Sequence, residues 1–399
     1  MKRVLYYCQN LLGLGHLVRS SEIIRHLAGV FEVCLVFGGE RVAGFELPAG
    51  VRVEYLPALR RERGELIVIG GGRSLGEVKT ERERRLLAIY HEVAPDGVII
   101  EGFPFSKRAL AFELVPLLEA VCGAGRPVHV ATSLRDVVLA GKGEGKRGRR
   151  EGEIVGRMNR FVDTLYVHSD ERVLRLDERF SRLGDIRSEV VYTGYVVAED
   201  GGGGLSGVEL AGPRPLVVVS VGGGRLGHDL LDGLVPALGI LGERVPHVFR
   251  IFSGPLMPAG KYGELCRRTE GMPHVVVRRY TPHLGDYLRR AELSINLCGY
   301  NTAMEVMKSG VRSLAFPSDK DLEQRIRAER FEALGILSVL EAGELLPERL
   351  AERVCGALAQ GRRGSGGGVF AADGARATAE HFRAAVARKL EGLAAPCFF

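Results

Sequence analysis

Short apolar runs alternate along this chain with longer segments whose apolar residues recur at helical spacing. In the first half the runs predict strands at residues 4–8, 32–37, 51–56, 97–101, 128–132, 164–167 and 190–193. Helical spacing occupies residues 17–27, 76–93 and 107–121. Runs that are apolar throughout are typical of parallel strands covered on both faces. The alternation therefore predicts an α/β fold of βαβ units in doubly wound parallel sheets.

The alternation stops at a glycine-rich break and then starts again, which predicts two domains. With 399 residues the chain is also too long for one ordinary core. We expect a first Rossmann-like domain over residues 1–197, a linker over 198–213 and a second Rossmann-like domain over 214–370. A last amphipathic helix lies within residues 371–399. Ligands of such sheets bind beyond the carboxyl ends of the strands, so a cleft between two facing domains is the expected site.

Composition excludes several classes of protein. The seven cysteines are scattered without paired spacing, which argues against a disulfide framework or a zinc site. Basic stretches are not interleaved with aromatic residues, so the net charge of +6 predicts no nucleic-acid partner. The sequence shows neither the apolar core of a signal peptide at its start nor a run long enough to span a bilayer. We expect a cytoplasmic protein and leave peripheral contact with an anionic membrane open.

The first glycine-rich turn, "NLLGLGHLVRS", follows the first predicted strand. Its third fingerprint position is Val18, and the acidic residue that follows the second predicted strand, Glu40, comes late, so a dinucleotide-binding turn remains only a weak alternative. His16 lies where the following helix begins. A helix N-terminus disfavours the protonated imidazole, which favours a general base. The alternative is that His16 only bonds the loop or the donor phosphates.

The second turn, "SVGGGRLG", predicts an anion site. Ser220 ends a strand, and Gly222, Gly223 and Gly224 allow the backbone to approach a ligand before the next helix begins. Arg225 adds a positive charge beside them. No Gly-Lys-Ser/Thr follows, so this is not a Walker loop. The alternative is a tight turn without a ligand.

A third turn, "CGYNTAMEV", lies between a strand and a helix. Gly299 makes the turn, and the start of the helix is marked by Tyr300, Asn301 and Thr302. Glu305 follows one turn later. A helix N-terminus beneath a diphosphate and a carboxylate near ribose hydroxyls would recognise a sugar nucleotide. The alternative is a capped helix in which Glu305 complements the helix dipole.

Three stretches together resemble a known family. "GLGHLVRS", "SVGGGRLG" and "CGYNTAMEVMKSG…FPSDKDLEQRIRAERFEALGI" resemble the GT-B glycosyltransferases. The nearest group is the predicted glycosyltransferases related to the peptidoglycan-precursor N-acetylglucosaminyltransferase, which are family 28-like. "EGFPFSKRALAFEL", "SLRDVV", "LYVHSDERV", "VYTGYV" and "FSGPLMP" extend the likeness over nearly the whole chain. The resemblance implies an amino-terminal domain that binds the acceptor, a carboxyl-terminal domain that binds the nucleotide-sugar, and a last helix that packs back on the first domain.

The resemblance also assigns roles to residues. It implies diphosphate contacts at the second and third turns, Glu305 on the ribose, Gln324 near the sugar or ribose, and backbone around Tyr280 on the uracil. The histidine of the G-x-G-H-x-x-R pattern, His16, is the implied base, with Asp136 as the runner-up. The candidate acceptor-side residues are Gly13, Gly15, Arg19, Phe103 and Arg135.

Three stretches of the acceptor domain depart from the family pattern: "YYCQN", "EGFPF" with "FPFSKR", and a long insert at residues 141–153. The insert is interpreted as a solvated basic loop, with contact to a phosphorylated or lipid acceptor as the alternative. His168 and His228 are expected to line the cleft. Asp319 and Asp321 have D-x-D spacing, which we interpret as coincidence, and we expect neither a metal nor a cofactor besides the UDP-sugar co-substrate.

The resulting hypothesis is an inverting, metal-independent glycosyltransferase. It would move a sugar, with N-acetylglucosamine the best guess, from a UDP-sugar to the hydroxyl of a small molecule, an antibiotic precursor or a glycolipid. One alternative is a UDP-sugar hydrolase or epimerase of the same fold. The other is a non-catalytic nucleotide-sugar-binding protein.

Overall fold

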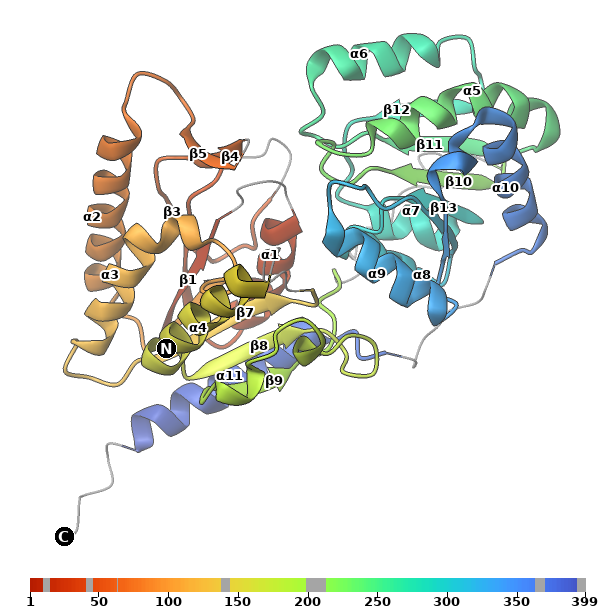
Figure 1. The fold of residues 1–399 in the computed structure, drawn as a ribbon. Helices are drawn as coiled ribbons and strands as arrows, with labels where there is room; N and C mark the ends of the chain where they lie inside the picture. The colour runs from red at the N-terminus through yellow and green to blue at the C-terminus, as the bar shows by residue number, and fades with distance from the viewer. Residues whose placement is uncertain are drawn as a thin grey trace. The chain divides into compact units, whose positions relative to one another are not determined.

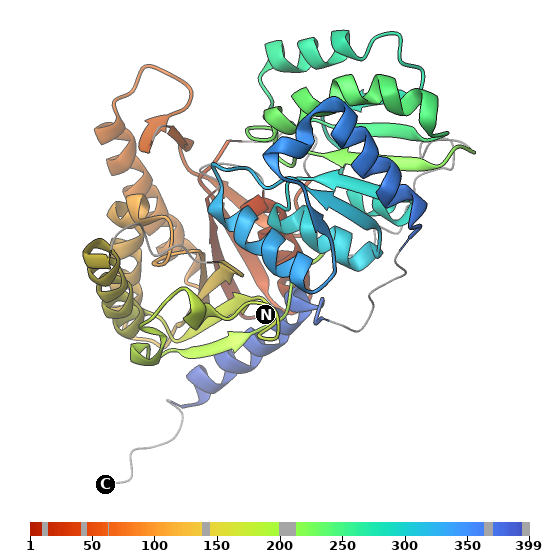
Figure 2. The same cartoon turned by 45° about the vertical axis from the view of Figure 1, so that its right-hand side comes forward.

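A computed structural model describes residues 1–9, 15–40, 46–62, 64–137, 144–198, 213–362 and 370–392. The chain divides into two compact units (Figure 1; Figure 2). The first unit comprises Met1–Val196 with Ala371–Phe399, and the second comprises Val197–Phe370. Each unit is built on its own parallel sheet, so the predicted α/β class is confirmed. Among the helices of the described residues, none is long and apolar enough to cross a bilayer.

The first unit contains a seven-stranded sheet in the order β3-β2-β1-β6-β7-β8-β9, and each neighbouring pair is parallel. Its strands are β1 (Arg3–Cys8), β2 (Glu32–Phe37), β3 (Arg52–Tyr55), β6 (Gly97–Glu101), β7 (His129–Arg135), β8 (Thr164–His168) and β9 (Glu189–Tyr192). All seven predicted strands are present, although β7 runs on to Arg135. A short antiparallel hairpin, β4 (Leu59–Glu62) and β5 (Glu65–Val68), was not predicted.

Helices cover both faces of this sheet (Figure 1). One face packs against α2 (Leu75–Val93), α3 (Ala111–Cys122) and α4 (Glu144–Phe161). The other packs against α1 (Gly15–Ala28) and α11 (Gly374–Glu391). Three 3₁₀ turns complete the unit: η1 (Arg108–Leu110), η2 (Leu176–Glu178) and η3 (Leu183–Asp185).

Helix α4 corrects the interpretation of the insert as a loop. From residue 144 onward the insert is helical, while residues 141–143 lie outside the described residues. Further along the helix, Ile154 and Met158 are buried in the core and anchor it. Near its start, Arg147 and Glu151 form an i,i+4 ion pair with a 2.9 Å separation. High glycine content suggested a loop, but one buried apolar face outweighs glycine's helix penalty of roughly 1 kcal/mol per residue.

The end of the described chain packs on the first unit. The Tyr195 amide donates to the Ala371 carbonyl at 2.8 Å, and the Ala371 amide donates to Asp170 at 3.2 Å. Helix α11 then lays Phe382 across Gly97 of β6. A Cβ at Gly97 would come within 2.5 Å of the Phe382 ring, so the close approach requires glycine there.

The second unit contains a six-stranded sheet in the order β12-β11-β10-β13-β14-β15. Its strands are β10 (Leu216–Ser220), β11 (Val248–Phe252), β12 (Val275–Arg278), β13 (Leu293–Asn296), β14 (Arg312–Ala315) and β15 (Ser338–Val339). One core contains side chains of α5 (His228–Arg244), α6 (Ala259–Arg268) and α10 (Pro347–Ala359). The opposite core contains α7 (Leu284–Arg290) and α8 (Tyr300–Ser309). The remaining elements are α9 (Leu322–Ala333) and η4 (Ala342–Leu345).

Candidate active site

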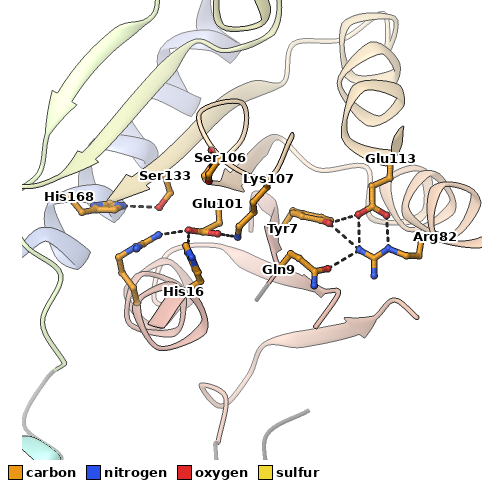
Figure 3. A network of polar contacts seen from close by, with 12 residues as sticks. Tyr7, Gln9, His16, Arg82, Glu101, Ser106, Lys107, Glu113, Ser133 and His168 are labelled. Carbon is orange, nitrogen blue, oxygen red and sulfur yellow. Dashed lines mark hydrogen bonds and ion pairs between the residues drawn. The ribbon is translucent and has the colours of Figure 1, made fainter. Parts of the chain in front are cut away.

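Charged side chains gather at the carboxyl edge of the first sheet, where β1, β6 and β7 are neighbours. Glu101 is the last residue of β6 and Arg135 the last residue of β7. Helix α1 begins at Gly15, so His16 is its second residue. Because carboxyl ends of parallel strands share one edge, residues far apart in sequence meet there (Figure 3).

Glu101 is the centre of this cluster (Figure 3). Its carboxylate is 1% exposed and lies 2.6 Å from His16 Nδ1 through Oε1. Arg19 Nη2 donates to the same oxygen at 2.5 Å. Lys107 forms an ion pair with the other oxygen, Oε2. A buried carboxylate needs such partners, since desolvation without them is expensive.

The Glu101 contact selects one tautomer of His16. When Nδ1 carries the proton and donates to Glu101, Nε2 keeps its lone pair. The His16 side chain is 18% exposed, so it is mostly buried yet reachable. Burial and the charges of Arg135, Lys107 and Arg19 hold the pKa of His16 well below its usual range. The ring is therefore a neutral group at physiological pH, as a general base requires.

Lys107 is itself perturbed by this environment. Its backbone is left-handed, with φ 59°, and its ammonium is almost fully buried. Burial, with the charges of Arg19 and Arg135, lowers the pKa of Lys107 to about 7. The cluster therefore concentrates positive charge around one carboxylate.

The other predicted residues of the first unit differ in their surroundings. Asp136 is 2% exposed and accepts from the Val137 amide at 2.9 Å. Phe103 is buried, and its carbonyl accepts from Thr132 Oγ1 at 2.7 Å, so it supports the loop after β6. Arg19 is buried and braces Glu101. Gly13 lies outside the described residues.

A second buried network lies beside the first, at the right of Figure 3. Arg82 of α2 binds Glu113 of α3 through two bonds, 2.8 Å from Nε and 2.7 Å from Nη2. Tyr7 of β1 donates to the same carboxylate at 2.5 Å, and Gln9 accepts from Arg82 at 2.9 Å. Burial and the Glu113 charge raise the pKa of Tyr7 well above its usual range. This network ties two helices to the strand before His16.

The two other candidate histidines have structural partners. His168 is fully buried between Ser133 and Thr193, at 2.8 Å from each hydroxyl, so the expectation that it lines a ligand site is wrong (Figure 3). Burial and the Arg19 charge hold its pKa well below the usual range. His228 lies in the second unit, where its Nε2 is 3.2 Å from the Gly224 carbonyl.

The second unit brings its two glycine turns together. Ser220 and Asn296 are register partners in neighbouring strands, so both turns leave the same sheet edge. Gly222 and Gly224 have φ of 61° and 86°, values that favour glycine. A Cβ on Gly224 would lie 2.5 Å from the Ser253 carbonyl, whereas Gly222 has nothing within 4 Å of that position. The turn is therefore packed on one side and has room for a ligand at Gly222.

The helix after the third turn begins without a capping side chain. Gly299 is its N-cap residue, and nothing lies within 4 Å of where its Cβ would stand. Tyr300, Asn301 and Thr302 form the first turn of α8. Such a terminus carries partial positive charge that favours an anion. The exposed side chain of Arg225 follows the neighbouring glycine turn.

Among the predicted ribose and uracil residues, Glu305 lies beside the helix that follows the segment of Tyr280. The Glu305 carboxylate is 2.6 Å from where a Cβ on Gly285 would stand, which brings α8 to the N-terminus of α7. Tyr280 lies in the segment leading to that helix, and burial raises its pKa. Gln324 is buried and accepts from the Ser318 amide at 3.0 Å.

The Asp-x-Asp spacing has a structural explanation. Asp321 is the N-cap of α9 and accepts from the amides of Glu323 and Gln324. Asp319 pairs with Arg325 at 3.1 Å. Across the described ranges, no group of three or more His, Cys, Asp or Glu side chains is arranged to hold a metal ion.

Sequence reasoning missed Glu101 and Lys107. Both occur in the stretch "EGFPFSK", which was compared with the family pattern while its charged residues were given no role. A carboxylate that ends a wholly apolar strand beside the strand preceding His16 is the signal that would have identified Glu101. The Lys107 contact depends on a left-handed turn that no residue pattern indicates.

Comparison with known proteins finds a family match in the second unit. Residues 258–363 match the model of the glycosyltransferase family 28 C-terminal domain. This match includes Tyr280, Glu305 and Gln324 and excludes the glycine turn at Gly222. No curated protein matches the chain in sequence.

Solved structures resemble the chain over nearly its whole length. The calicheamicin glycosyltransferase CalG4 has a TM-score of 0.56 at 15% identity, with 98% of each chain covered. MurG of Acinetobacter baumannii has a TM-score of 0.53 at 14% identity, covering 97% of this chain and 100% of its own. A UGT transferase from Siraitia grosvenorii in complex with UDP has a TM-score of 0.55 at 13% identity, with 99% and 100% covered. At such identities these likenesses establish the fold.

Proposed function

We propose that this chain, which has the GT-B fold and carries a glycosyltransferase family 28 domain, transfers a sugar from a UDP-sugar to an acceptor hydroxyl. The observation that carries the proposal is the register pairing of Ser220 with Asn296. It places a glycine turn and an uncapped helix N-terminus at one sheet edge, as a diphosphate requires. UDP as the nucleotide is supported by the UDP complex of the Siraitia grosvenorii structure.

The donor roles follow from this arrangement. The turn at Gly222 and the first turn of α8 would hold the diphosphate, with Arg225 beside them. Glu305 would bind the ribose, and Tyr280 belongs to the segment proposed for uracil. N-acetylglucosamine is our preferred donor sugar because of the likeness to the peptidoglycan-precursor enzymes. These groups would stabilise the charge on departing UDP without a metal ion.

The acceptor chemistry is assigned to His16. Its Nε2 would take the proton of the acceptor hydroxyl, whose oxygen then forms the new bond to the anomeric carbon. The bond from that carbon to the diphosphate breaks, and its electron pair leaves with UDP. Attack opposite the leaving group inverts the anomeric configuration. The role of Glu101 is to hold the tautomer and orientation of His16.

The test combines binding with turnover. Calorimetry should show UDP binding and no NADH binding; binding of NADH alone would overturn the function. UDP release that depends on an added acceptor separates a transferase from a hydrolase, an epimerase and a non-catalytic binder. Activity should persist in excess EDTA.

We also propose a reducing, cytoplasmic compartment, because the six cysteines in the described residues are free thiols.

A further inference from the structure

The turn that precedes α8 has a strained residue at its centre. Cys298 has a φ of 56°, in the left-handed region that a residue with a side chain adopts at a cost of roughly 1–2 kcal/mol. Its amide donates to Asn296 Oδ1 at 2.8 Å. The Asn296 side chain is fixed in turn, because its Nδ2 donates to the hydroxyls of Ser294 and Ser313 at 2.9 and 2.8 Å. Such a conformation persists only where its surroundings hold it, and the sheet supplies one of the contacts that do so.

Arg327 of α9 holds the same residue through its carbonyl. The Arg327 Nη1 donates to the Cys298 carbonyl at 2.9 Å. The guanidinium also lies over the ring of Tyr300, the first residue of α8, at 5.6 Å from the ring centroid. Arg327 is 1% exposed. Because a guanidinium is expensive to bury unless it is hydrogen-bonded, the position of this side chain and the shape of the turn depend on each other.

The Cys298 carbonyl and the Gly299 amide belong to one peptide unit. This peptide is trans, so its C=O and its N–H point in opposite directions. By fixing the carbonyl, Arg327 therefore fixes the Gly299 N–H so that it points away from the guanidinium. Gly299 is the N-cap residue of α8, and the space where its Cβ would stand is open. The direction of this amide is thus set by a side chain from a different helix.

We propose that Arg327 is a positioning residue for the donor: by holding the Cys298 carbonyl, it directs the Gly299 amide toward the diphosphate of the UDP-sugar. This inference rests on the proposed function, because it takes the turn before α8 to bind the diphosphate. Arg327 acts through the backbone rather than by touching the donor, since its side chain is buried. An N–H that is already fixed needs no reorganisation when charge develops on the departing UDP, so the same contact assists departure.

The test compares a ligand that carries the diphosphate with one that lacks it. Calorimetry measures UDP binding, and displacement of UDP measures uridine binding, in the wild-type chain, R327Q, R327K and R353Q. R327Q removes the charge and shortens the side chain, whereas R327K keeps a cation that can donate to the carbonyl. R353Q is the matched control, because Arg353 of α10 also donates to a carbonyl at the end of a strand of the second unit, that of Val339, at 3.4 Å. Urea unfolding reports the stability of each protein.

We expect R327Q to bind UDP about 10-fold or more weakly, the loss of a hydrogen bond to a charged group, and uridine less than about 2-fold more weakly. R327K should show a smaller loss that is also confined to UDP, and R353Q should bind both ligands as the wild-type chain does.

Wild-type UDP affinity in R327Q, or equal losses of UDP and uridine, would overturn the positioning role while leaving the proposed function in place. If R327Q does not fold, R327K decides: a loss confined to UDP supports the role, and equal losses or wild-type binding of both ligands contradict it. A wild-type chain that binds neither UDP nor uridine would instead overturn the proposed function, and this inference with it.

Discussion

The carboxyl edge of the first sheet presents buried charged side chains, whereas the carboxyl edge of the second presents glycine turns and a helix N-terminus. In the first, Glu101 is surrounded by His16, Arg19 and Lys107, so contacts with one carboxylate hold these side chains in place. In the second, Gly222 and Gly299 leave room for a ligand, so the candidate site is formed by the backbone of the turns. The difference suggests a division of work, with proton transfer assigned to one unit and donor binding to the other.

The largest expected effect concerns His16. His16→Ala should lower the single-turnover rate by roughly 10²–10⁴-fold, the usual contribution of general base catalysis. Asp136→Asn, which changes a buried side chain on the same edge, is the matched control and should retain most activity. Near-normal turnover in the His16 variant together with an inactive Asp136 variant would assign the base to Asp136.

The substitution Glu101→Gln tests how far the stability of the first unit depends on the charge of this carboxylate. Removing the charge leaves Arg19 buried without its carboxylate, which should destabilise the fold by about 3–5 kcal/mol. Glu153→Gln removes one partner of an exposed pair and should change stability by about 0–1 kcal/mol. Urea unfolding measures both free energies. Equal effects would mean that the Glu101 cluster is no more coupled to the fold than a surface pair.

Alanine substitutions at two glycines of one turn test how far the stability of the second unit depends on the backbone conformation there. Both Gly222 and Gly224 have positive φ, so alanine at either position should cost about 1–2 kcal/mol. Gly224→Ala should cost more, because its Cβ would meet the Ser253 carbonyl. The difference between the two unfolding free energies isolates the close packing. A larger loss for Gly222→Ala would contradict the described geometry.

The smallest effect is a shift in pH dependence. Only neutral His16 accepts a proton, and its pKa is lowered, so turnover should stay level as pH falls through 6.5 and decline only below it. Lys107→Met removes a cation facing the ring and also leaves Glu101 less neutralised. Both changes raise the pKa of His16, so the acid limb should move up by on the order of one pH unit or less. A wild-type limb at or above pH 6.5 would contradict this account.

The same contrast explains what the sequence predicted. The strands and the two glycine turns of the second unit follow from local patterns, because periodicity and glycine spacing report backbone geometry directly. Glu101 and His16 lie 85 residues apart in the sequence, and their partnership follows from strand order, which places β6 beside β1. The local pattern shows Glu101 as a carboxylate that ends an apolar strand, but only the strand order identifies His16 as its partner.

Two other differences have similar causes. Helix α4 was obscured by its glycines, and its stability comes from buried residues further along, such as Met158. The bonds of Arg82 with Glu113 join two helices, and either residue alone resembles an ordinary surface charge in a helical pattern. Both the stability of α4 and the Arg82–Glu113 bonds depend on tertiary contacts, which the spacing of residues along the sequence does not show.

The most direct test of the division between the units is UDP calorimetry of His16→Ala beside Glu305→Ala. The account predicts that His16→Ala keeps wild-type UDP affinity, while Glu305→Ala weakens it about 10- to 100-fold, the loss expected for a hydrogen bond to a charged group. A Glu305 variant with unchanged affinity, or a His16 variant that no longer binds UDP, would contradict the central claim.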